Sequence, residues 1–112
     1  MDEQLSQGIG LFNDGEFFRC HEVLEEVWTH EKGPRRLFLQ AVIHIAVGLY
    51  HCQCANPTGA SGQLDKALSK LDSYRPSYEG IDTARLYVDV VAARASIDAA
   101  SPLVQYPRIH PS

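Results

Sequence analysis

The length, composition and charge of the chain place it among small globular proteins. With 112 residues and 45% hydrophobic side chains it has material for one core, which argues against a disordered chain and predicts a single domain over residues 1–112. The formal net charge of −4 lacks the basic surplus that is typical of nucleic-acid binding, so we expect no nucleic-acid partner.

The N-terminal sequence and the longest apolar run bear on localisation. The first residues lack the basic region and apolar stretch of a secretory signal. The apolar run from Ala41 to Tyr50 is interrupted by His44 and is much shorter than the roughly 20 residues of a membrane-spanning helix. Three cysteines cannot all pair within one chain, and reduced thiols are the simpler interpretation. We therefore predict a cytoplasmic protein without a membrane partner.

Apolar residues at helical spacing predict three helices in the N-terminal half. The first is expected over about residues 2–13, before the turn signal Asn13-Asp14-Gly15. The second is expected over about residues 16–30. Pro34 suits the first turn of a third helix that extends to about Cys54, because proline lacks the N–H group that is unused there.

The C-terminal half predicts two more helices and an extended tail. Residues 56–59 are expected to form a loop before a fourth helix over roughly residues 61–74. Asp82 is a natural N-cap for a fifth helix that ends near Ala100. The tail from Ser101 contains three prolines and is expected to lie extended across the bundle. The predicted fold class is all-α, a compact bundle of about five helices with an extended C-terminal tail.

The predicted fifth helix is unusually apolar. At about 100° per residue its clearly polar stripe contains only Arg85, Asp89 and Ser96. Such a helix is either central in its bundle or borders another subunit. A homodimer is therefore one explanation of the pattern, and a central position explains it without a partner.

The predicted second helix contains an imidazole and a carboxylate one turn apart. On a helical wheel, His21 and Glu25 face inward, with His21 beside Trp28. Glu22 and Glu26 point to solvent. The zinc protease motif requires a second histidine at the position of Glu25, so we reject the protease interpretation. A His/Glu pair at this spacing can still share one metal ion.

Three polar side chains interrupt the otherwise apolar third helix. Gln40, His44 and His51 fall within roughly 40° of one another around its axis. Gly48 lies between the two histidines and leaves room for a ligand or another helix. Structural interpretations of this stripe are a solvent edge and a hydrogen-bonded network in the core.

The polar groups of the second and third helices meet if these helices pack antiparallel. Two histidines and one carboxylate with open positions are a known metal-site type, so His21, Glu25 and His51 are candidate ligands of a divalent metal such as zinc. The same three are candidate catalytic residues for metal-free acid–base chemistry. The candidate substrate-binding residues are Gln40, His44, Trp28 and Asn56.

One cationic cluster stands out in the sequence. Lys32, Arg35 and Arg36 lie in the turn beside Glu31. A solvated helix start explains the cluster at least as well as phosphate binding does.

These residues also resemble the signature of a known family. The matching segments are FNDGEFF at residues 12–18, HEVLE at residues 21–25 with Trp28, FLQ at residues 38–40, Ala46 through LYH at residues 49–51, Asn56 with Gly59 and Ala60, and GID at residues 80–82. Over about residues 11–86 the chain resembles the domain-of-unknown-function family numbered 309. The resemblance implies a compact helical bundle and a position for the site, but no reaction.

The resemblance also implies a set of polar positions. Carried onto this chain, the set comprises Asn13, His21, Glu22, Glu25, Gln40, His51, Asn56 and Asp82. Many relatives carry Gln where this chain has His44, which argues against a metal site that requires His44. Asn13 and Asp82 also have structural interpretations, as turn and capping residues.

Two classes of function fit these observations. One is an enzyme for a small molecule, metal-assisted or acid–base, in which Glu25 orients His21 and the substrate is bound by His51 and Gln40. The other is a non-catalytic interaction or adaptor module, because the first two helices resemble one tetratricopeptide-like hairpin, although repeat arrays need about three. An enzyme requires an accessible cavity beside His21, and an adaptor requires an exposed apolar groove.

Overall fold

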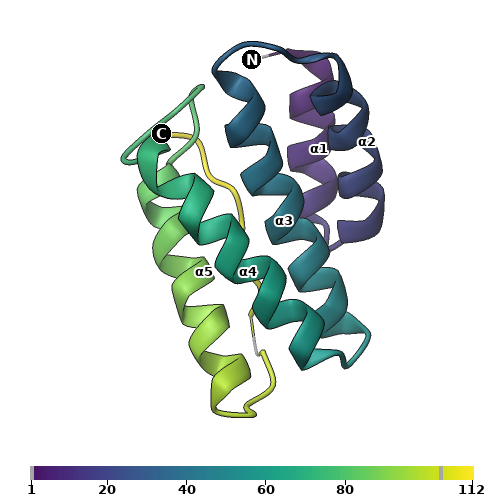
Figure 1. Ribbon diagram of the computed structural model, residues 1–112, viewed down its shortest axis with the longest axis vertical. Coiled ribbons are helices and arrows are strands. Elements are labelled where there is room, and N and C mark those ends of the chain that lie inside the picture. Colours follow the sequence, from purple (N-terminus) through teal and green to yellow (C-terminus); the bar gives the residue numbers. More distant parts are fainter. Residues whose placement is uncertain (1, 104) are drawn as a thin grey trace.

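The computed structural model describes residues 2–103 and 105–112, and the predicted all-α bundle is confirmed. The described residues form five α-helices and no extended strand (Figure 1). In chain order the helices are α1 (Glu3–Asn13), α2 (Phe17–His30), α3 (Arg35–Gln53), α4 (Pro57–Leu71) and α5 (Thr83–Asp98), with a short 3-10 helix (Asp72–Tyr74) after α4.

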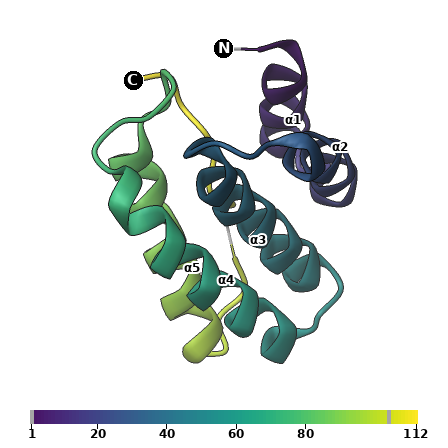
Figure 2. The ribbon, with the colours of Figure 1, turned by 45° about the horizontal axis from the view of Figure 1, so that its top comes forward.

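Helix α3 is the central helix of the bundle. The pair α1 and α2 lies on one side of it, and α4 with α5 lies on the other (Figures 1 and 2). The α3 residues buried on several faces are Phe38, Leu39, Ala41, Val42, Ile43, Ile45, Ala46, Gly48 and Leu49. This all-round burial explains the near-continuous apolar sequence of α3. No described helix is long and apolar enough to cross a membrane.

Helix α5 lies at an edge of the bundle, so the central position that we considered for it is wrong. Its main helix contact is with α4. Leu86 and Val90 are buried, whereas Val88 and Val91 on the outer side are 63% and 44% exposed. The apolar circumference of α5 therefore includes an outward face that the described residues leave open.

The start of α4 corrects the predicted loop at residues 56–59. Helix α4 begins at Pro57, one turn earlier than we expected. The Asn56 side chain accepts a hydrogen bond from the Gly59 N–H group at 3.1 Å, which caps the helix. Proline at the first helical position completes this start signal. Asp82 is confirmed as the N-cap of α5, since it accepts from the Arg85 N–H group at 2.9 Å.

The C-terminal tail packs along the bundle, as predicted. The Asn13 side chain donates to the Ile109 carbonyl at 2.9 Å and accepts from the Ile109 N–H group at 2.8 Å. The Asp82 N–H group donates to the His110 carbonyl at 2.8 Å. The tail therefore links the α1–α2 turn to the start of α5, and Asn13 has a long-range role beyond the turn.

The space beside Gly48 is filled by a neighbouring helix. A Cβ atom at Gly48 would lie 2.8 Å from Leu64 Cδ2 and 3.3 Å from Gln63 Cβ, both on α4. Of the two uses predicted for this gap, the structure shows close approach of another helix.

Candidate functional site

The hollow between α2 and α3 brings His21 and His51 together. It has a volume of about 200 Å³ and is lined by Phe18, His21, Val47, Tyr50 and His51. The first two residues lie one turn apart on α2, and the other three lie in the last two turns of α3. We refer to this site as the histidine hollow.

Aromatic rings form much of the wall of the histidine hollow. The Phe18 ring centroid lies 5.3 Å from that of Tyr50 and 5.5 Å from that of His21. Phe18 is 48% exposed, so part of its ring is open to solvent. Phe18 was not among the site residues that we predicted from the sequence. The available signal was its position one turn before His21 on the same helix edge.

The His21 ring is held by Glu25. His21 Nε2 lies 3.1 Å from Glu25 Oε2. Because a carboxylate accepts the hydrogen bond, Nε2 carries the proton and Nδ1 presents a lone pair when the ring is neutral. Nδ1 is buried and has no hydrogen-bond partner among the described residues. His21 therefore has one nitrogen fixed by a carboxylate and one nitrogen left unpaired.

Glu25 does not face inward as predicted. Its side chain is 53% exposed, against 22% for His21. A carboxylate with a single imidazole partner keeps its remaining hydrogen bonds by staying in water, because burial without partners is costly. Glu22 and Glu26 are exposed, as predicted.

The His51 ring is held by the cap of α4. Its Nδ1 lies 3.3 Å from Asn56 Nδ2, and the Asn56 carbonyl oxygen is already engaged with the Gly59 N–H group. Asn56 therefore donates to His51 Nδ1, which places the proton of a neutral His51 ring on Nε2. The two imidazoles of the histidine hollow thus differ: His21 offers a lone pair and His51 offers an N–H group.

The predicted metal site does not fit this arrangement. Over residues 2–103 and 105–112, no three His, Cys, Asp or Glu side chains lie close enough together to hold one ion. Glu25, the third predicted ligand, contacts His21 but does not line the hollow that His21 shares with His51.

His44 and Gln40 lie outside the histidine hollow. His44 Nδ1 lies 2.7 Å from Gln63 Oε1, so this ring belongs to the contact between α3 and α4. Burial lowers the pKa of His44, and Lys70 and Lys66 add to the effect, although the Gln63 hydrogen bond opposes it. Gln40 is half-buried on α3. The predicted stripe is therefore divided between two neighbouring surfaces.

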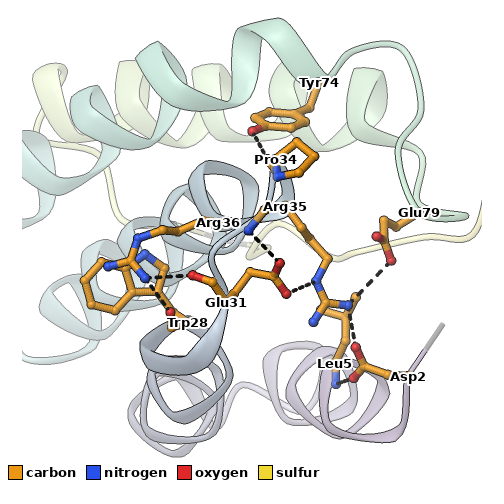
Figure 3. A network of polar contacts seen from close by, with 10 residues as sticks. Asp2, Leu5, Trp28, Glu31, Pro34, Arg35, Arg36, Tyr74 and Glu79 are labelled. Atoms are coloured by element: carbon orange, nitrogen blue, oxygen red, sulfur yellow. Dashed lines mark hydrogen bonds and ion pairs between the residues drawn. The ribbon is translucent and has the colours of Figure 1, made fainter.

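Trp28 is occupied by a structural contact. The Arg36 guanidinium lies 3.9 Å from its ring centroid (Figure 3). Arg36 Nη1 also donates to the Trp28 and Glu31 carbonyls at 2.8 and 2.9 Å. Arg36 thus satisfies carbonyl groups at the end of α2, and Trp28 does not line the histidine hollow.

Arg35 is also engaged within the fold. It forms ion pairs with Asp2, with Glu31 at 3.4 Å and with Glu79 at 3.8 Å (Figure 3). These contacts join the start of α1, the α2–α3 turn and the segment before α5. Both arginines are therefore engaged in contacts within the fold, which differs from the solvated helix start that we considered for the cationic cluster.

The chain belongs to a family of proteins that is defined by one domain. Residues 5–62, just over half of the chain, match the family model described as "Domain of unknown function (DUF309)". The matched span covers most of α1, all of α2 and α3 and the start of α4, and it contains every described residue that lines the histidine hollow. It ends before residue 86, to which the predicted resemblance extended.

Two relatives place this domain in longer proteins. An "Uncharacterized protein" of Aquifex aeolicus is 28% identical over 98 residues, which are 85% of this chain and 29% of the relative. The "Uncharacterized protein YpuF" of Bacillus subtilis is 32% identical over 74 residues, which are 63% of this chain and 42% of the relative. The matched regions therefore take up less than half of each relative.

Proposed function

We propose that the histidine hollow binds a small molecule and acts on it by metal-free acid–base chemistry, with His21 as the proton acceptor. The observation that carries this proposal is the unpaired Nδ1 atom of His21, which is buried on a residue that lines the hollow together with His51. Buried polar atoms normally have a partner, and an N–H or O–H group of a ligand would supply it. Glu25 then stabilises the imidazolium that forms when Nδ1 takes the proton.

The other wall residues define the ligand. His51 donates from Nε2 to an acceptor, and the rings of Phe18 and Tyr50 pack against an apolar or planar part. The volume of about 200 Å³ lies below the roughly 300–1,000 Å³ of pockets for drug-sized compounds. The ligand is therefore a small ring or short chain with one donor and one acceptor.

The test uses ligand-observed NMR with small hydroxylated rings such as phenol and hydroxypyridine. Binding is expected to the wild type and to be lost in His21→Ala. His30→Ala is the matched control, because His30 forms the same kind of pair, 3.6 Å from Glu26, on the exposed side of α2. Equal binding by His21→Ala and the wild type would contradict the proposal, with circular dichroism establishing that each variant is folded.

Elemental analysis decides between this mechanism and the metal-assisted version. Purified wild type is compared with His21→Ala, and we expect no stoichiometric zinc, iron or manganese in either sample. Near-stoichiometric metal that disappears in His21→Ala would replace the metal-free mechanism by a metal centre.

A second candidate function is an interaction module. The open apolar face of α5 favours it, because Val88 and Val91 there are 63% and 44% exposed and exposed apolar patches mark sites where proteins dock. A homodimer is the simplest form, and Val88 on α5 would lie in its interface. Sedimentation velocity of the wild type beside Val88→Lys tests that form, since only an α5-mediated dimer dissociates in the variant.

A further inference from the structure

A second hollow lies where α3 and α5 end, and none of the described residues that line it is charged. Its volume is about 530 Å³, and its walls come from the start of α4, from residues 100–103 and from Tyr106 as well as from the two helix ends. We refer to it as the apolar hollow. Its lining residues are Cys52, Ala55, Asn56, Pro57, Ile97, Ala100, Ser101, Pro102, Leu103 and Tyr106.

Two alanines of the apolar hollow hold a backbone conformation that favours glycine. Ala55 follows α3 with a φ of 56°, and Ala100 follows α5 with a φ of 54°. The Asn56 N–H group donates to the His51 carbonyl at 2.9 Å. In the same way, the Ser101 N–H group donates to the Ser96 carbonyl at 2.9 Å. Both helices therefore end in the Schellman motif, which usually has glycine at this position.

Both alanines line the same hollow while their backbone is strained. Glycine at either position would relieve the strain and remove apolar surface from the wall. The shared location gives the hollow an apolar wall formed by two helix ends.

Tyr106 is the aromatic residue of this wall. Its ring is fixed by stacking on Phe17, with centroids 5.5 Å apart. Its hydroxyl has no hydrogen bond to the described residues, and burial raises its pKa, so it stays a neutral donor. Asn56 also lines the hollow, but one of its amide N–H groups is engaged by His51 and its carbonyl oxygen by the Gly59 N–H group.

We infer that the apolar hollow binds an uncharged, mostly apolar small molecule that accepts a hydrogen bond from the Tyr106 hydroxyl. A charged ligand would lose its hydration without gaining a counter-charge from the wall. The volume lies in the range of pockets for drug-sized molecules, which suits a two-ring aromatic compound with one carbonyl or ether oxygen. This site is separate from the histidine hollow and does not depend on its proposed function.

The test uses prodan, an uncharged naphthalene ketone whose fluorescence shifts to the blue in apolar surroundings. We expect saturable binding at one site per chain, with equal affinity for the wild type and His21→Ala. Tyr106→Phe keeps the stacked ring and should weaken binding by roughly three- to tenfold, the effect of one hydrogen bond. Ala55→Gly combined with Ala100→Gly should also weaken binding while raising Tm.

Cysteine alkylation locates the bound probe independently of these variants. Cys52 lines the apolar hollow, whereas Cys54 is exposed and lies outside it, so the chain contains its own control. Saturating prodan should slow the reaction of Cys52 with iodoacetamide at least threefold and leave Cys54 unchanged. Absence of saturable binding, or binding without protection of Cys52, would overturn the inference.

Discussion

The two ends of α3 differ in what their polar side chains contact. At the start, Arg35 and Arg36 are engaged by carboxylates, backbone carbonyls and the Trp28 ring (Figure 3). At the other end, His51 borders the histidine hollow and Cys52 borders the apolar hollow. The charged groups at the start are held in contacts within the fold, and the unpaired Trp28 Nε1 atom there belongs to a residue that lines neither hollow. A candidate site is therefore marked here by an unpaired polar group beside open volume, rather than by charge or by an unpaired group alone.

The largest effect on stability is expected at the start of α3. Arg36→Ala removes a donor from two carbonyls and the cation from the Trp28 face, so the free energy of unfolding should fall by about 2 kcal/mol. Lys32→Ala is the control, because Lys32 is exposed and in no ion pair among the described residues. Urea unfolding followed by circular dichroism measures both. Similar losses in both variants would refute a structural role for Arg36.

A smaller effect of opposite sign is expected just beyond the end of α3. Ala55→Gly removes a methyl group from a residue with a φ of 56°, and the free energy of unfolding should rise by about 0.5 kcal/mol. Ala95→Gly, on the exposed side of helix α5, should instead lower it by about 1 kcal/mol. The same urea experiment compares them, and two losses would show that Ala55 is unstrained.

His44, in the middle of α3, should make the free energy of unfolding depend on pH. Burial lowers the pKa of His44 below its ordinary value of 6.5, so below about pH 6.5 the unfolded chain takes up a proton that the folded protein resists. Stability should therefore fall as the pH decreases through this range, and His44→Gln should show a smaller fall. Urea midpoints at about pH 5 and about pH 7.5 provide the measurement. An identical pH dependence in both proteins would exclude His44 as a contributor.

The smallest effect is expected for His51 itself. Its hydrogen-bonding partner Asn56 is exposed and can bond to water, so His51→Ala should change the free energy of unfolding by no more than about 0.5 kcal/mol. Asn56→Ala removes the cap of α4 and should cost about 1 kcal/mol. Thermal unfolding of the pair measures the difference. A larger loss in His51→Ala would make His51 a structural residue like Arg36.

The sequence predicted the helices well because their signals are local. Apolar spacing, Asp82 as a cap and Pro34 before α3 act within a turn of the residues concerned. The predicted start of α4 was wrong because Asn56 followed by proline is a signal for a loop and for a capped helix alike. For the site, the sequence predicted that His21 and His51 meet, but it missed Phe18, whose exposure depends on how α2 packs.

The sequence by itself determined where each side chain points around its own helix axis. It placed Gln40, His44 and His51 on one stripe of the third helix and Glu25 one turn after His21. Only the tertiary structure decided that His44 contacts α4 while His51 borders the hollow with His21. Helix periodicity is a local property, whereas the neighbour that a side chain meets depends on packing between segments far apart in the chain.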